Sequence, residues 1–194
     1  MQSDDKPASK LKTFIQEATR QFSGPLDPRT ATERLRPLLA KLVAVDDWLD
    51  EAFCKPHPQY YQQYLLHCDP LERFSVVSFV WGPGQKTPIH DHTVWGLIGM
   101  LRGSEISTDY QPRDGRLERA GETTLVPGQV ESLLPGHNDI HLVRNAHEDQ
   151  VSISIHVYGA NIGRVRRHVY DPQSGAPKEF VSGFSSAVMP NVWG

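Results

Sequence analysis

The sequence has few cysteines, little net charge and no long hydrophobic run. Its two cysteines, Cys54 and Cys68, are too few to build a disulfide framework, and we expect both to be reduced thiols of a cytoplasmic protein. A formal net charge of -3 without long basic runs gives nucleic-acid binding no electrostatic support. The apolar runs are far shorter than a bilayer span, and residues 1–6 lack the layout of a signal peptide, so we expect no membrane association.

The chain does have the length and composition of a globular domain. It has 194 residues, of which 38% are hydrophobic and 22% charged, enough for one core and an additional N-terminal segment. We expect residues 1–58 to form a helical extension packed on a barrel of residues 59–194, as one structural domain. The tail 164–194 mixes charge, proline and glycine and is expected to wrap back over the barrel.

Helical patterns occur before residue 58. Apolar positions at three- and four-residue spacing predict an amphipathic helix over 11–22. Thr30 is the expected N-cap of a second helix, in which Pro37 predicts a kink or a restart, and Asp46 that of a third short helix reaching Phe53. A DNA-binding helix-turn-helix is the alternative to a helical cover on a sheet, but the acidic clusters that begin at Asp46 argue against it.

From Tyr60 onward the sequence changes to short apolar runs separated by Gly, Pro and Asp. These runs predict strands at 73–81, 93–101, 105–110, 117–120, 123–126, 129–133, 140–143 and 150–158. Hairpin turns are predicted at 112–115 and 126–128. Many short strands at this spacing indicate a β-sandwich or barrel.

A pair of histidines within this region is the strongest chemical signal. On a strand, His90 and His92 point to the same face while Asp91 points to the other. His141 opens a second strand-like stretch and supplies a third possible ligand. A solvated histidine pair on a sheet surface is the alternative for an isolated His-x-His.

The residues around these histidines favour the metal site. Gly84, Gly96 and Gly103 frame the first stretch, and Asn145 follows His141 by four positions. Together they resemble the two sequence motifs of the cupin superfamily. Gly96 stands where most cupins carry a glutamate ligand, so three neutral imidazoles would leave the double charge of a metal ion intact. Such a site suits an anionic ligand, and a thiolate is a strong candidate.

Ser154, His156 and Tyr158 alternate along one predicted strand and therefore share a face. A hydroxyl, an imidazole and a phenol in line can form one chain of hydrogen bonds, with His156 fixing the orientation of the phenol. The alternative from the pattern alone is a strand whose polar residues face solvent.

These motifs together resemble the cysteine dioxygenase family of thiol dioxygenases over residues 60–167. The resemblance implies a mainly β fold, the cupin barrel (double-stranded β-helix or jelly roll), with the N-terminal helices as a cover. It implies that His90, His92 and His141 bind Fe(II) and that Tyr158, with Ser154 and His156, forms a triad beside the iron. Members use O2 to convert a small-molecule thiol into a sulfinic acid, and no obligate protein partner is implied.

Two departures from the animal cysteine dioxygenases bear on the substrate. Those enzymes have a cysteine, crosslinked to the triad tyrosine, where this chain has Gly96, so no thioether can form. They also hold the substrate carboxylate with an arginine whose place is taken here by Gln63, with Gln62 as the alternative alignment. A glutamine offers neither charge nor a bidentate clamp, so cysteine would be held poorly.

In this respect the chain resembles the bacterial 3-mercaptopropionate dioxygenases, in which an arginine late in the chain binds the carboxylate. The resemblance assigns this role to Arg167, with Arg166 and Arg164 as alternatives, while an ordinary surface arginine is the competing interpretation. Trp95 and Tyr60 are candidates for the pocket wall, although both can equally be core residues.

Other functions fit part of the pattern. L-cysteine dioxygenase is the nearest alternative. Metal-dependent isomerases and quercetin-type dioxygenases are also cupins, but they usually keep the glutamate that Gly96 replaces. A non-catalytic metal-binding sensor of small molecules would not need a triad beside the metal.

Overall fold

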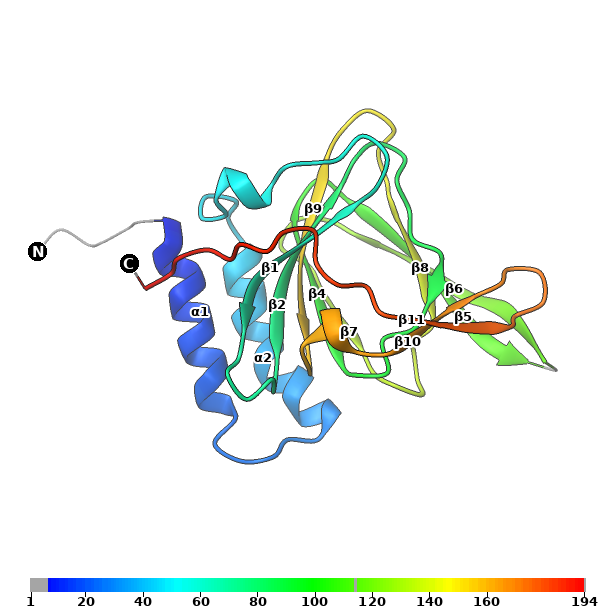
Figure 1. The fold of residues 1–194 in the computed structure, drawn as a ribbon, viewed down its shortest axis with the longest axis horizontal. Helices are drawn as coiled ribbons and strands as arrows, with labels where there is room; N and C mark the ends of the chain where they lie inside the picture. Colours follow the sequence, from blue (N-terminus) through cyan, green and yellow to red (C-terminus); the bar gives the residue numbers. More distant parts are fainter. Residues whose placement is uncertain (1–6, 114, 194) are drawn as a thin grey trace, which may run out of the picture.

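The computed structural model describes residues 7–113 and 115–193, and in it two antiparallel sheets pack face to face with two α-helices outside them (Figure 1). The helices are α1 (Pro7–Gln21) and α2 (Pro28–Val43), with short 3-10 helices η1 (Glu51–Phe53) and η2 (Ile162–Arg164). The strands are β1 (Gln62–Cys68), β2 (Ser75–Trp81), β3 (Ile89–His90), β4 (Gly96–Arg102), β5 (Glu105–Arg113), β6 (Arg116–Leu125), β7 (Val130–Leu133), β8 (His141–Asn145), β9 (Ser152–Tyr158), β10 (Arg167–Tyr170) and β11 (Pro177–Phe180). The sheets have the orders β1-β2-β9-β4-β7 and β11-β10-β3-β8-β5-β6. The predicted mainly β architecture with N-terminal helices is confirmed.

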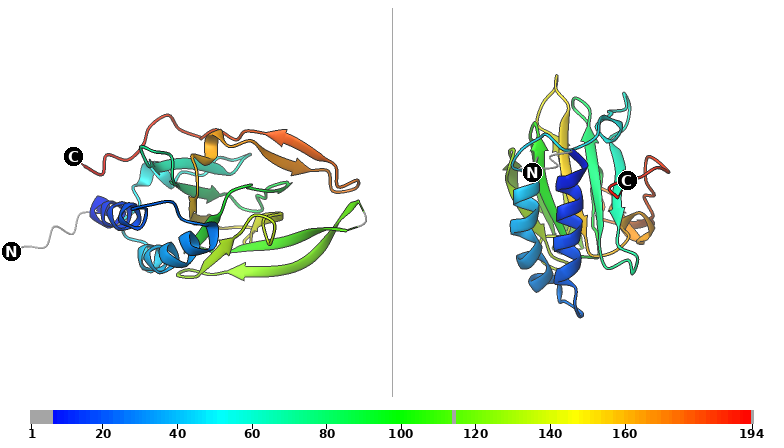
Figure 2. Two further views of the ribbon diagram at one scale, coloured as in Figure 1. Left: turned by 90° about the horizontal axis from the view of Figure 1, so that it is seen from below. Right: turned by 90° about the vertical axis from the view of Figure 1, so that its left-hand side faces the viewer.

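The helices cover the outer face of the five-stranded sheet. Figure 2 shows α1 and α2 side by side against this sheet, and α2 contacts β4 and β7. Gly99 of β4 permits the close approach, since a Cβ atom there would lie 3.0 Å from side-chain atoms of both Leu39 and Val43. The helices thereby bury the outer side chains of the sheet in one apolar core.

Strand β9 separates this apolar core from the space between the sheets. Its side chains Ile153, Ile155 and Val157 belong to the core under the helices. The alternating residues Ser154, His156 and Tyr158 are also buried, but they face the opposite way, between the sheets. The polar face predicted for this strand therefore lies inside the barrel, and the alternative of a solvent-exposed polar face is wrong.

The second helix differs from its prediction at two points. Asp27 is the N-cap instead of Thr30: its carboxylate accepts hydrogen bonds from the backbone N of Thr30 at 3.0 Å and from its hydroxyl at 2.6 Å. Pro28 fills the first turn, where proline is favoured. Pro37 neither ends nor divides the helix, because it lies on the exposed face, where water can solvate the carbonyl group that it leaves unpaired.

The predicted third helix is not α-helical. Residues 45–49 form bends, and of the predicted helix only η1 is helical, with Asp50 as its cap through a hydrogen bond from the backbone N of Ala52. The buried Trp48 explains the difference, because its indole Nε1 donates to the carbonyl oxygen of Leu42 at 2.9 Å. Trp48 thus folds back onto the C-terminal end of α2 and does not continue a helical turn.

Several strand predictions also need correction. The runs 117–120 and 123–126 form one strand, β6, because a bulge opposite Asp109 and Tyr110 of β5 absorbs the irregularity. The segment 126–128 turns the chain between sheets and makes no hairpin, since β7 pairs with β4. The predicted turn 112–115 includes Asp114, which lies outside the described residues, but Arg113 and Arg116 pair on either side of it.

Strands β1, β10 and β11 were not predicted. Two of them lie in the C-terminal tail, where β10 pairs with both β3 and β11. Farther along, the backbone N of Ser185 donates to the carbonyl oxygen of Gln63, and Val192 is buried in the core under the helices. The tail therefore runs from the six-stranded sheet past β1 to the helices.

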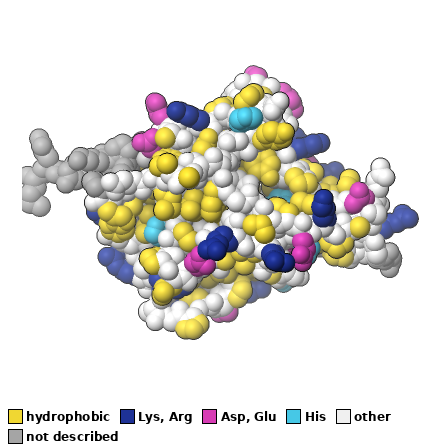
Figure 3. All heavy atoms as spheres, viewed as in Figure 1, with side chains coloured by type: hydrophobic (Ala, Val, Ile, Leu, Met, Phe, Trp, Pro, Cys, Tyr) yellow, Lys and Arg dark blue, Asp and Glu magenta, His cyan; other side chains and the backbone are white. Residues whose placement is uncertain are grey.

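Charged side chains of both signs are mixed on the surface. On the face shown in Figure 3, acidic and basic side chains are interspersed among hydrophobic and neutral ones, with no extended area of one charge. Within residues 7–113 and 115–193, no helix has the length and apolar character needed to cross a bilayer.

The packing of α2 on β4 generates a stability prediction. Leu39 is 0% exposed between them, so Leu39→Ala should lower the free energy of unfolding by about 2–5 kcal/mol in urea denaturation, through lost apolar burial and a residual cavity. Leu71→Ala is the matched control, because Leu71 is 74% exposed and should change it by less than about 0.5 kcal/mol. Equal effects of the two substitutions would contradict this packing.

Candidate metal centre

Three histidines converge between the sheets. His90 ends β3, His92 follows two residues later, and His141 begins β8, where it pairs with His90 across the sheet. All three are buried, and one ligand atom from each lies within 4.8 Å of the others. The ring centroid of His90 is 4.8 Å from each of the other two, which are 5.0 Å apart.

His92 reaches this cluster through a turn. Strand β3 ends at His90, and Thr93 has a φ of 58°, in the left-handed region. Asp139 holds the turn: Oδ1 accepts from the backbone N of His92 at 3.1 Å, and Oδ2 from that of Thr93 at 3.0 Å. The convergence was predicted from strand alternation, which is not the geometry found, and Asp139 was missed. Its only sequence signal is its place two residues before His141.

Each of the three rings has a polar partner at Nδ1: the carbonyl oxygen of Pro88 lies 3.1 Å from His90, Asp139 Oδ1 3.0 Å from His92, and Ser107 Oγ 3.0 Å from His141. A carbonyl or an ionised carboxylate oxygen can only accept, so Nδ1 of His90 and of His92 carries the hydrogen. In a neutral ring the lone pair then lies on Nε2. Oriented Nε2 donors, each fixed by a second partner, fit a divalent transition metal.

The electrostatics keep these rings in the form that binds metals. Burial lowers the pKa of His90 and of His141 well below the ordinary value, and repulsion by the neighbouring histidines lowers each further. Both rings are therefore neutral at pH 7, and a neutral imidazole is the ligating form.

No carboxylate joins this cluster within the described chain. Gly96, at the position of the usual cupin glutamate, faces the ring of Tyr158, and a Cβ atom there would lie 3.2 Å from two ring carbons. Asp91 accepts hydrogen bonds from His168 Nδ1 at 2.9 Å and from the Tyr170 hydroxyl at 2.8 Å, both on β10. The donor set available to a metal is thus three uncharged nitrogens.

The three polar residues of β9 form a continuous chain of hydrogen bonds. Tyr158 Oη lies 2.7 Å from His156 Nδ1, and His156 Nε2 lies 2.8 Å from Ser154 Oγ. Phe79 stacks on His156 with centroids 4.0 Å apart, and Tyr158 stacks on His92 at 5.3 Å. Burial lowers the pKa of His156 and raises that of Tyr158, so the ring and the phenol are both neutral. The chain therefore leads from the histidine cluster into the barrel.

Two residues that the sequence did not suggest complete this chain. Glu105 is 2% exposed, and its Oε2 lies 2.9 Å from Ser154 Oγ. The indole Nε1 of Trp81 donates to Ser154 Oγ at 3.2 Å. They come from β5 and β2, on opposite sheets, so no local pattern links them to Ser154. Burial raises the pKa of Glu105 to about 7.

The three candidate arginines differ sharply in their placement. Arg167 is buried; its guanidinium donates to Ser182 Oγ at 2.8 Å and lies 4.7 Å from the centroid of Phe180. Its Nε is buried without a hydrogen-bond partner, and its charge interacts with Tyr158 and with the histidine rings. Arg164 and Arg166 have side chains 79% and 81% exposed, and each pairs with a surface glutamate. The interpretation of Arg167 as an ordinary surface residue is wrong.

The two glutamines also separate. Gln62 donates from its side chain to the carbonyl oxygens of Tyr60 and Tyr61, so it folds back onto its own loop. Gln63 shares a strand face with Leu65, which packs in the interior cluster that includes Tyr158. The side-chain Oε1 of Gln63 is buried and unpaired within the described chain.

Two aromatic candidates lie away from the site. Tyr60 is 67% exposed and stacks on His57, so its place in the pocket wall was wrongly predicted. Trp95 packs in the core under the helices, against Phe22. The missed aromatic residue is Tyr61, which is partly buried between the sheets, stacks on Trp81 at 4.9 Å, and interacts electrostatically with Arg167.

Both cysteines are free, as predicted, and both are partly buried. Burial raises the pKa of the Cys54 and Cys68 thiols, so neither is an activated thiolate.

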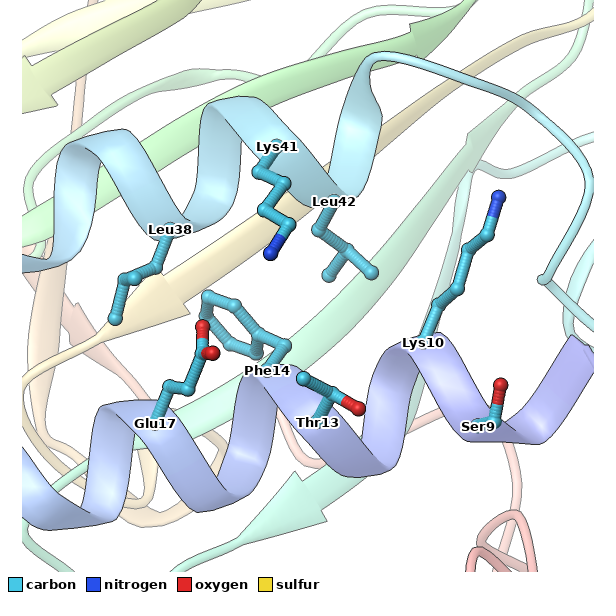
Figure 4. Close-up of a pocket in the computed structure, with 8 residues that line it drawn as sticks. All are labelled: Ser9, Lys10, Thr13, Phe14, Glu17, Leu38, Lys41 and Leu42. Carbon is cyan, nitrogen blue, oxygen red and sulfur yellow. The ribbon is translucent and has the colours of Figure 1, made fainter. Parts of the chain in front are cut away.

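A separate surface pocket lies between α1 and α2. Figure 4 shows Phe14 and Leu42 between the two helices, with the charged ends of Lys10, Glu17 and Lys41 around them. Because the helices cover the outer face of the five-stranded sheet, this pocket is on the opposite side of that sheet from the histidines.

A model of the family described as Cysteine dioxygenase type I matches residues 47–171. Among solved structures, an uncharacterized conserved protein with a double-stranded beta-helix domain from Klebsiella pneumoniae has 18% identity and a TM-score of 0.45, covering 58% of this chain and 89% of that one. A Cupin 2 conserved barrel domain protein from Salinispora arenicola has 20% identity and a TM-score of 0.42, covering 58% and 86%. A cupin-2 domain from Rhodospirillum rubrum has 13% identity and a TM-score of 0.45, covering 62% and 74%.

The role of Asp139 generates a prediction about metal affinity. Asp139→Asn removes the charge that orients the His92 ring, so the affinity for Zn(II), measured by calorimetry, should fall about 10- to 100-fold. Asp47→Asn is the control, because Asp47 pairs with Lys10 on the surface. Unchanged affinity in a folded Asp139→Asn protein would show that this carboxylate does not support a metal site.

Proposed function

The chain belongs to the cysteine dioxygenase type I family, whose members are thiol dioxygenases, and from this premise we propose that it converts 3-mercaptopropionate into its sulfinic acid with Fe(II) and O2. The observation that carries the proposal is a buried guanidinium, that of Arg167, whose Nε has no hydrogen-bond partner in the described chain and whose charge acts on the clustered histidines His90 and His141. The reaction is R–SH + O2 → R–SO2H. Sulfur gives up four electrons and O2 takes them, so no external reductant is needed.

The histidine cluster supports iron as the metal. His90, His92 and His141 would hold the ion through Nε2. Imidazole ligands suit several first-row metals, but oxidation by O2 requires an ion that changes its redox state, which excludes zinc. Bound there, Fe(II) would supply the redox chemistry between O2 and the thiolate.

Charge balance supports an anionic substrate. Three neutral ligands leave the ion its charge of +2, which favours a thiolate over a neutral thiol. Arg167 adds a second, buried positive charge on a guanidinium that finds only a neutral hydroxyl, Ser182 Oγ, as its hydrogen-bond partner in the described chain. Arg167 interacts electrostatically with Asp91 and Asp139, but no carboxylate of the described residues is hydrogen-bonded to it. A substrate carboxylate would supply that partner through charge-assisted hydrogen bonds.

The same balance disfavours L-cysteine, which differs from 3-mercaptopropionate by an α-ammonium group. The nearby buried carboxylates already have partners: Asp139 holds the His92 turn, Asp91 accepts from His168 and Tyr170, and Glu105 bonds Ser154. None of these three carboxylates is left to pair with an ammonium beside Arg167. Among the described residues, the buried carboxylate oxygen without a partner is Asp109 Oδ1, on β5 opposite His141. Binding L-cysteine against Arg167 would therefore leave its ammonium without a carboxylate partner there.

Tyr158 is the residue we assign to the reacting end of the substrate. Its ring stacks on His92, and its hydroxyl keeps its proton because burial raises its pKa. A neutral phenol beside the metal can donate or accept a hydrogen bond without adding charge. His156 fixes the position of the hydroxyl, and the surrounding apolar side chains, Val77, Phe79 and Ile162, exclude water.

The experiment that tests this function is oxygen uptake by iron-loaded protein with a panel of thiols. We expect kcat/KM for 3-mercaptopropionate to exceed that for L-cysteine at least about tenfold, because the ammonium is left unpaired. Replacement of iron by zinc should abolish uptake. Equal or better turnover of L-cysteine would contradict the proposed substrate and favour an L-cysteine dioxygenase.

Arginine variants test the carboxylate site in the same assay. Arg167→Ala should lower kcat/KM for 3-mercaptopropionate at least about thirtyfold, mainly through KM, and should reduce the preference over a neutral thiol such as 2-mercaptoethanol. Arg166→Ala is the control, because that side chain is exposed. Equal effects of both substitutions would remove Arg167 from the carboxylate site.

A further inference from the structure

The hydroxyl of Ser154 has three polar neighbours but only one hydrogen to give. Its Oγ lies 2.9 Å from Glu105 Oε2, 2.8 Å from His156 Nε2 and 3.2 Å from Trp81 Nε1. An indole N–H can only donate, so the serine hydrogen goes either to Glu105 or to His156. The two possibilities exclude each other.

The protonation state of Glu105 decides between them. An ionised carboxylate can only accept, so it takes the hydrogen of Ser154, and His156 must then donate from Nε2 to the serine oxygen. A protonated Glu105 donates to that oxygen instead, and the serine hydrogen passes to His156 Nε2. Each state of Glu105 therefore selects one neutral tautomer of His156.

The tautomer of His156 fixes the direction of the Tyr158 hydroxyl. When Nε2 carries the hydrogen, Nδ1 is an acceptor, and the phenol donates its only hydrogen to Nδ1 across the distance of 2.7 Å. When Nδ1 carries the hydrogen, it donates to the phenol oxygen, and the phenol hydrogen is free to point toward the histidine cluster. Hydrogen bonds in such a chain reverse together.

We propose that Glu105 is a positioning residue whose proton sets the direction of the chain Glu105–Ser154–His156–Tyr158, and thereby decides whether Tyr158 can donate a hydrogen bond to the substrate. This inference rests on the proposed thiol dioxygenase function for its kinetic consequence alone. Ser154 and His156 lie between Glu105 and the three histidines in this chain of hydrogen bonds. The protonation of Glu105 is therefore not that of a residue in contact with the proposed metal ligands.

The surroundings of Glu105 place this switch near neutral pH. Burial and, to a smaller extent, repulsion by Glu131 of β7 raise its pKa, hydrogen bonds from Ser154 and Trp81 lower it, and the net result is a pKa of about 7. The titratable groups that interact with Glu105 are Glu131, Tyr158 and, through Ser154, His156. Glu131 in turn interacts with Asp109 of β5 and Arg36 of α2. As pH rises through about 7, Glu105 loses its proton and Tyr158 loses its free hydrogen.

The direct test is nitrogen NMR of His156 in the full-length chain loaded with Zn(II), which is diamagnetic, and it needs no substrate. In the wild-type protein the hydrogen should move from Nδ1 to Nε2 between about pH 6 and pH 8.5, with a midpoint near 7. Glu105→Gln should abolish the transition. A single tautomer of wild-type His156 across this range would overturn the proposal, whether or not the protein oxidises thiols.

Glu131→Gln is the matched control. Glu131 raises the pKa of Glu105 through charge repulsion and forms no hydrogen bond with Ser154, so this substitution should shift the midpoint to lower pH and keep the transition. If Glu131→Gln abolished the transition and Glu105→Gln did not, Glu131 would be the group that titrates and the proposal would be wrong.

Kinetics then test the consequence for catalysis. The ratio of wild-type to Glu105→Gln kcat/KM for 3-mercaptopropionate cancels the ionisation of the substrate itself. It should fall on the order of tenfold between about pH 6 and pH 8.5, as Tyr158 loses its free hydrogen. A ratio independent of pH, with activity present in both proteins, would contradict the switch and leave the dioxygenase function standing. Absence of thiol oxidation in the wild-type protein would instead contradict the proposed function.

Discussion

The pairing of buried polar groups between two sheets is the constraint on which this structure depends. An unpaired polar atom there costs free energy, so each imidazole that points into the barrel needs a partner for its second nitrogen. Pro88, Asp139 and Ser107 meet that need for the three clustered histidines, and those bonds also orient the rings. The same rule extends along β9 and ends at a carboxyl group on the opposite sheet. The interactions that let the barrel fold are therefore those that prepare its site.

Two of the five buried side-chain polar atoms that lack a hydrogen-bond partner in the described chain belong to residues proposed to bind the substrate. Arg167 Nε and Gln63 Oε1 are both buried without partners, close to a donor set that would leave a bound ion with its full charge. The proposed substrate brings both a thiolate and a carboxylate. Because Gly96 has no side chain, the ring of Tyr158 packs closely against β4. Within the described residues, the hydroxyl of Tyr158 is held by its hydrogen bond with His156.

Sequence reasoning succeeded where the chemistry follows a repeat and failed where it depends on distant contacts. The period of two on β9 located its polar face, and the family motifs located the three histidines. Asp139 and Glu105 were missed because each acts on residues 46 to 49 positions away, through contacts that exist only after the sheets pack. Tyr60 was chosen over Tyr61 because their loop leads into β1 without a repeat that tells inside from outside. The third helix was likewise wrongly predicted, because the hydrogen bond from Trp48 to Leu42 folds this segment back onto α2.

We propose that the three histidine nitrogens and the buried guanidinium of Arg167 together bind a thiol that carries a carboxylate. An anaerobic crystal structure of the Fe(II) protein with 3-mercaptopropionate tests it most directly. We predict iron on Nε2 of His90, His92 and His141, the substrate sulfur bound to the ion, and the carboxylate against Arg167. An Asp or Glu oxygen bound to iron, or a substrate carboxylate far from Arg167, would contradict the account.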